Sequence, residues 1–124
     1  NNPDMESENI RIVGNLFDGT KFGGIYVIGH GHEISGNILR NLNTARCTEQ
    51  AAQFGCLYGD DPALLRSGIY LGKGVKRLQE TRDNVIRDNR ISGWKMKSRC
   101  IAFAPGVARK ANQVTANRCE NQPE

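Results

Sequence analysis

Short apolar runs alternate with polar turns along the chain, and two kinds of run recur in a fixed order. The first kind is a short β-prone stretch that ends just before an asparagine, as at Asn15, Asn37, Asn84 and Asn117. The second kind is an apolar run with small residues at its ends, found at 24–29, 68–72 and 100–104. Two patterns that recur in one order are typical of a chain that stacks repeated coils.

Within the second kind of run the period is two, which predicts β-strands because successive side chains of a strand point to opposite faces. One face is expected to contribute to a core shared by the coils: Ile25, Val27, Ile69, Leu71, Ile101 and Phe103. The opposite face then presents Tyr26, Tyr70 and Ala102. Further inner positions are expected in the asparagine-linked runs: Ile12, Phe17, Ile34, Leu39, Ile86 and Val114.

This order of short strand, asparagine turn and glycine-bounded strand resembles the right-handed parallel β-helix of the pectate lyase superfamily. The resemblance extends over 9–121 and lies in the periodicity, without a catalytic motif. It implies an all-β solenoid of about three to four coils, with inward amides stacked in a ladder of Asn15, Asn37, Asn84 and Asn117. We expect asparagine there because it also tolerates a left-handed backbone. An antiparallel β-sandwich is the alternative fold, but it does not require the two patterns to keep their order.

The 124 residues fit a single domain, 1–124, with one inserted loop at 44–66. So short a solenoid exposes unpaired strand edges at both ends. We therefore expect either a piece of a longer β-helix or end-to-end contact with another chain. The chain opens without a leader segment, so any signal peptide would already have been removed. Apolar runs of about eighteen residues are missing, which predicts no membrane-spanning helix.

The four cysteines allow three pairings, and we expect Cys47 to pair with Cys56 and Cys100 with Cys119. Such bridges predict a secreted or periplasmic protein. The alternative is four free thiols in a cytosolic protein.

The net charge is +4, and many cations occur late in the chain. They include Lys73, Lys76, Arg77, Lys95, Lys97, Arg99, Arg109 and Lys110. A cationic face attracts anionic partners. Aromatic residues do not alternate with these cations as they do in single-strand binders, so we expect no nucleic acid partner. A solvated rim that keeps strand edges soluble is the simpler interpretation.

In the pectate lyase superfamily the substrate groove follows one outer sheet, which by resemblance contains the strands near 25–28, 69–71 and 101–104. On it we predict substrate contacts from Tyr26, Tyr70, Lys76 and Arg77, with loop 44–66 as a wall carrying Tyr58, Asp60 and Asp61. The two tyrosines could stack on sugar rings or simply pack on each other.

A lyase or epimerase acting on an acidic polysaccharide must neutralise the substrate carboxylate and remove the proton beside it. The candidates for this chemistry are His30, His32 and Lys73. Hydrolysis would need two carboxylates, and neither Asp60 with Asp61 nor Asp83 with Asp88 has a defined separation. The cofactor is undetermined: calcium could bind Glu33, Asp60 and Asp61, but no calcium motif is present. A non-catalytic segment that binds glycan or a partner chain, or that forms a structural part of a larger exported protein, is the alternative function.

Overall fold

The computed structural model describes residues 8–47, 56, 63–72, 81–97 and 100–121. Their strands form three sheets, and every pairing between strands is parallel. The first sheet contains β1 (Arg11–Val13), β4 (Glu33–Ser35), β7 (Val85–Arg87) and β10 (Gln113–Thr115). The second contains β2 (Leu16–Asp18), β5 (Ile38–Leu42), β8 (Arg90–Gly93) and β11 (Arg118–Asn121). The third contains β3 (Ile25–Val27), β6 (Ile69–Leu71) and β9 (Ile101–Phe103).

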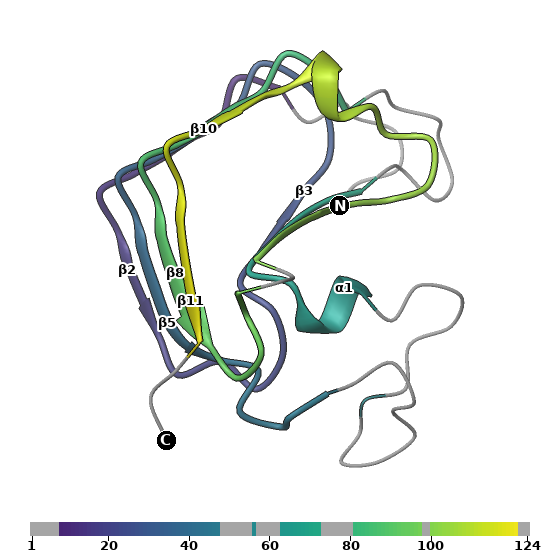
Figure 1. Cartoon of the computed structure of the whole chain (residues 1–124). Helices are drawn as coiled ribbons and strands as arrows, with labels where there is room; N and C mark the ends of the chain where they lie inside the picture. Colours follow the sequence, from purple (N-terminus) through teal and green to yellow (C-terminus); the bar gives the residue numbers. More distant parts are fainter. Residues whose placement is uncertain (1–7, 48–55, 57–62, 73–80, 98–99, 122–124) are drawn as a thin grey trace.

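The chain visits the first, second and third sheet in turn and then returns to the first. In Figure 1, β2, β5, β8 and β11 lie side by side along one wall, and β3 lies on another wall across the interior. Two short helices interrupt the coils, α1 (Ala63–Arg66) and the 3-10 helix η1 (Arg109–Ala111). The prediction of an all-β chain with parallel stacked strands is confirmed, and the antiparallel sandwich is excluded for the described strands.

The core consists of columns of apolar side chains that run from coil to coil. In the first sheet Ile12, Ile34, Ile86 and Val114 are in register. In the second, Phe17, Leu39, Ile91 and Cys119 are in register. The third has two columns, of Ile25, Ile69 and Ile101 and of Val27, Leu71 and Phe103. The middle members are fully buried, whereas all end members except the buried Val27 are only partly buried, so the core is best packed in the central coils.

An asparagine ladder lies at the bend between the first and second sheets, but one predicted member is wrong. Its members are Asn15, Asn37, Asn89 and Asn117. In each step the backbone N–H and the Nδ2 of one asparagine both donate to Oδ1 of the next, as from Asn37 to Asn89 at 3.1 and 2.9 Å. Asn84, assigned to this ladder from the sequence, belongs to another bend.

A second ladder, which the sequence analysis missed, lies at the entry to the first sheet. The backbone N–H of Ile10 donates to Nδ1 of His32, and the backbone N–H of His32 donates to Oδ1 of Asn84. The Nδ2 of Asn84 then donates to Oδ1 of Asn112 at 2.8 Å. The strand β7 follows Asn84, whereas the stretch expected before it forms an isolated bridge at Arg82 within the described residues.

The left-handed backbone at these bends belongs to the residue before the ladder asparagine, which corrects our expectation for asparagine itself. Gly14, Gly36, Asp88 and Ala116 have φ values of 68°, 64°, 56° and 56°. Glycine adopts this conformation without a steric penalty, whereas alanine does not. Aspartate tolerates this conformation better than alanine, so the last bend is the most strained of the four.

Close backbone approach explains the glycines at the start of two third-sheet strands. A Cβ on Gly24 would lie 2.5 Å from the carbonyl oxygen of Gly68 and 2.7 Å from Cδ2 of Leu39. A Cβ on Gly68 would overlap Ile91 and lie 2.8 Å from the carbonyl oxygen of Cys100. The chain can pass from the second sheet to the third so tightly only because these side chains are missing.

Both predicted disulfides, Cys47–Cys56 and Cys100–Cys119, are present. The second joins the residue before β9 to an inner position of β11, and so ties the second and third sheets together in the last coil. Two disulfides are typical of proteins from oxidising, extracytoplasmic compartments. Among the described helices, none has the length and apolar character needed to span a membrane.

Candidate functional site

The predicted tyrosine pair forms a stacked aromatic platform on the outer face of the third sheet. Tyr26 and Tyr70 are register partners on β3 and β6. Their ring centroids lie 5.6 Å apart with an interplanar angle of 12°. Tyr70 is buried at 3% exposure, whereas Tyr26 is exposed at 46%. Only the Tyr26 ring is therefore accessible to a ligand, and Tyr70 supports it from beneath.

Gly72 provides the space that the platform needs. A Cβ at this position would overlap the ring and hydroxyl of Tyr26. The next coil has Ala102 at the register position of the tyrosines, so the column of large side chains ends there. The platform is thus restricted to β3 and β6, and β9 beside it carries only a small side chain at this position.

His30 lies on the turn that leads from the third sheet to the first. It forms isolated parallel bridges to Glu8 in the preceding coil and Arg82 in the following coil. Its Nε2 lies 3.7 Å from a carboxylate oxygen of Glu8, and its side chain is 24% exposed. Three residues separate it from Tyr26 in the sequence, so it follows the platform strand at a partly open position.

His32 faces the other way and is built into the second ladder. Its side chain is buried, with the whole residue 5% exposed. Because Nδ1 accepts the Ile10 N–H at 3.1 Å, the proton must lie on Nε2, which contacts the Ile28 carbonyl oxygen at 2.7 Å. The two predicted histidines thus have separate partners and do not form a pair. Catalysis by His32 stays a prediction, and it would require breaking one of these bonds.

Three cations of the predicted site, Lys73, Lys76 and Arg77, lie outside the described residues. So do Tyr58, Asp60 and Asp61 of the inserted loop. The structure therefore places Tyr26, Tyr70 and His30 around one sheet and leaves the remaining predicted contacts untested.

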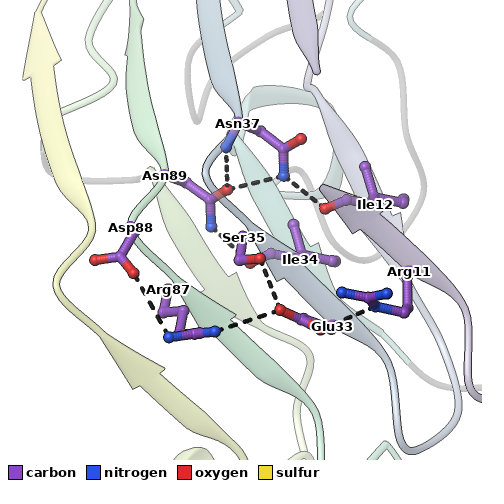
Figure 2. Close-up of polar contacts among 9 residues, drawn as sticks. All are labelled: Arg11, Ile12, Glu33, Ile34, Ser35, Asn37, Arg87, Asp88 and Asn89. Carbon is purple, nitrogen blue, oxygen red and sulfur yellow. Dashed lines mark hydrogen bonds and ion pairs between the residues drawn. The ribbon is translucent and has the colours of Figure 1, made fainter. Parts of the chain in front are cut away.

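Glu33 belongs to a charged cluster on the first sheet, and its suggested calcium partners Asp60 and Asp61 lie outside the described residues. Figure 2 shows its carboxylate between the guanidinium groups of Arg11 and Arg87, with N–O distances of 3.0 and 3.5 Å. The Ser35 hydroxyl donates to the same carboxylate at 2.9 Å. The Ser35 hydroxyl first and the Arg11 guanidinium second lower the pKa of Glu33. Across the described residues, no three His, Cys, Asp or Glu side chains group closely enough to hold a metal ion.

Asp18 forms a similar but smaller arrangement on the second sheet. Its carboxylate accepts hydrogen bonds from the Asn41 amide and from Nε of Arg40. The Asn41 amide and then Arg40 lower the pKa of Asp18. The arginine and asparagine partners come from neighbouring coils and favour the ionised carboxylates, and we assign these contacts to stacking of the coils.

No family model, curated protein or solved structure matches this chain.

Proposed function

We propose that the chain is a right-handed parallel β-helix of the pectate lyase superfamily, exported from the cell, that binds an acidic polysaccharide along the outer face of its third sheet. The observation that supports this proposal most directly is the platform of Tyr26 on Tyr70. A flat aromatic ring held by a second ring beneath it offers an apolar surface to the CH face of a sugar, and little side-chain entropy is lost on binding.

The charge of the chain favours an acidic polymer over a neutral one. The net charge is +4, and positively charged surfaces raise the local concentration of anions and their association rates. In the next coil, Arg82 occupies the position of this turn that His30 occupies in its own coil. The strand that holds Tyr70, β6, is followed closely in the sequence by three cations, Lys73, Lys76 and Arg77.

Binding is tested with the full chain and soluble polyuronates by isothermal titration calorimetry. Tyr26→Ala should weaken binding about tenfold or more, since burying a large aromatic side chain is worth about 1.5–3 kcal/mol. Leu16→Ala is the control, because Leu16 is also apolar and exposed, at 56%, but lies on the second sheet. Unchanged affinity in Tyr26→Ala, or no binding of any acidic polymer by the unaltered chain, would refute the proposal.

The sharper form of this function is a lyase or epimerase. Proton removal next to a uronate carboxylate needs a base at the open face and a positive group beside the carboxylate. His30 is our candidate from the described residues, and Lys73 is the candidate from the segment after β6. A rise in ultraviolet absorbance with a polyuronate, lost in His30→Ala or Lys73→Ala, would support elimination. A flat trace together with retained binding would exclude elimination and leave either an epimerase, which forms no unsaturated sugar, or a non-catalytic glycan-binding β-helix.

A further inference from the structure

The hydrogen bonds of the first ladder all point the same way along the solenoid. From Asn15 through Asn37 and Asn89 to Asn117, each backbone N–H and Nδ2 donates to the Oδ1 one coil later. No donor among the described residues reaches Oδ1 of Asn15 in the first coil. At the other end, the backbone N–H of Asn117 has no acceptor within the described part of the chain. One end therefore offers an unused acceptor and the opposite end an unused donor.

The apolar columns are also unfinished at both ends. The first coil opens on a pocket of about 380 Å³ whose lining includes Ile10, Ile12, Ile25 and Val27. Ile10 is 51% exposed. The last coil has a hollow of about 330 Å³ lined in part by Val114, Asn117 and Cys119. Exposed inner positions of this kind are normally covered by another coil or chain.

We propose that a second copy of this chain covers the open first coil, with its last coil stacked head to tail on β1 and β2. In this arrangement β10 of one copy lies beside β1 of the other, and β11 lies beside β2. The Asn117 N–H then donates to Oδ1 of Asn15 in the neighbouring copy. Val114 continues the column of Ile12, and Cys119 continues that of Phe17.

The polarity of the ladder selects head-to-tail stacking over a symmetric contact between two first coils. A symmetric contact would bring two Oδ1 acceptors together and leave both without a donor, which is costly when water is excluded. It would also make the edge strands of the two first coils run antiparallel to each other. The third sheet contains one described strand fewer than the others, so the first two sheets form the main part of this contact. Head-to-tail stacking along the solenoid axis does not close into a ring and therefore extends into linear arrays.

The proposal is tested by analytical ultracentrifugation of the full chain over a wide concentration range. A series of sizes that grows with concentration is expected. Ile12→Glu places a charge in the first-coil pocket, and Val114→Glu does so on the last coil. Each variant alone should be monomeric, whereas an equimolar mixture should form one-to-one dimers because each variant keeps one intact end.

Two results would overturn the proposal. One is a monomer at every concentration up to about the millimolar range, where weak contacts form. The other is dimerisation of Val114→Glu alone, which would show that two first coils bind each other. If circular dichroism shows that Ile12→Glu does not fold, Asn15→Ala replaces it, since this side chain is exposed at the end of the ladder. Loss of the acceptor should weaken self-association about tenfold, and unchanged association would contradict the head-to-tail ladder.

Discussion

The interior of the first ladder should contribute far more stability than its end, and Asn89→Ala measures this difference. The Asn89 side chain accepts two hydrogen bonds from Asn37 and donates to the Ile34 carbonyl and to Oδ1 of Asn117. Its removal leaves two N–H donors of Asn37 without an acceptor and takes the side-chain donor from the Ile34 carbonyl, and Asn37 is only 1% exposed. A buried polar group without a partner costs about 1–3 kcal/mol. We therefore expect a loss of about 3–5 kcal/mol in the free energy of unfolding, allowing for some relaxation.

Asn15→Ala is the matched control, because it removes the same side chain from the exposed first rung. Its Nδ2 donates to the Val13 carbonyl oxygen at 3.2 Å and to Oδ1 of Asn37 at 3.3 Å. The backbone N–H of Asn15 also donates to Oδ1 of Asn37, at 2.8 Å, and this bond does not need the Asn15 side chain. The expected loss is below about 1 kcal/mol. Urea unfolding of both variants, followed by circular dichroism with the slopes compared, measures the difference. Equal losses would show that the buried amides do not stabilise the fold through these hydrogen bonds.

Three further perturbations follow from the described contacts. Ala116→Gly should raise the free energy of unfolding by about 0.5–1 kcal/mol: the relief of the left-handed alanine outweighs the added entropy of glycine in the unfolded chain. A lower free energy of unfolding in urea would refute the strain. Replacing Cys100 and Cys119 together by serine should cost about 3 kcal/mol, since the bridge closes a loop with a sequence separation of 19; an unchanged urea midpoint would exclude this contribution. The pKa of Glu33 is lowered from 4.5 in the fold, so its contribution is present above that value and is lost as the pH falls through the folded pKa. Glu33→Gln should therefore flatten the acid side of the stability profile, and a parallel shift at all pH values would contradict this.

Much of the register could be predicted because period-two patterning and parallel stacking constrain it strongly. The pairing of Tyr26 with Tyr70 and the columns of the third sheet followed from the alternation of apolar and polar residues. Both disulfides followed from cysteine spacing. The structure shows that the two tyrosine rings pack on each other, and sugar binding by Tyr26 stays a prediction.

The ladder assignment failed because the chain contains the tripeptide Arg-Asp-Asn twice, ending at Asn84 and at Asn89. Both asparagines are buried and bonded to amides in neighbouring coils, so the local sequence does not separate them. The distinguishing signal lies three residues earlier. Asn89 has the core residue Ile86 at this position, as Asn37 has Ile34, whereas Asn84 has Thr81.

His32 could not be recognised from the sequence as a ladder member because a histidine stands where the other coils have asparagine. The functional interpretation depended on its closeness to His30, two residues away. Gly31 between them has a left-handed φ of 73°, which breaks the alternation of a strand, so the two rings lie in different environments, one beside Glu8 and one under the Ile28 carbonyl. Side-chain direction, rather than spacing along the chain, decides which of them is available to a ligand.

The bend between the first and second sheets always consists of two residues, whereas the other connections vary greatly in length. Between the second and third sheets they occupy 19–24, 43–68 and 94–100. The coils still stack in register, with ladder separations of 22, 52 and 28 residues. Chain can therefore be inserted or removed around the third sheet without disturbing the ladder on the opposite corner. A lineage could exchange the loops beside the tyrosine platform, and with them the ligand, while inheriting the same scaffold.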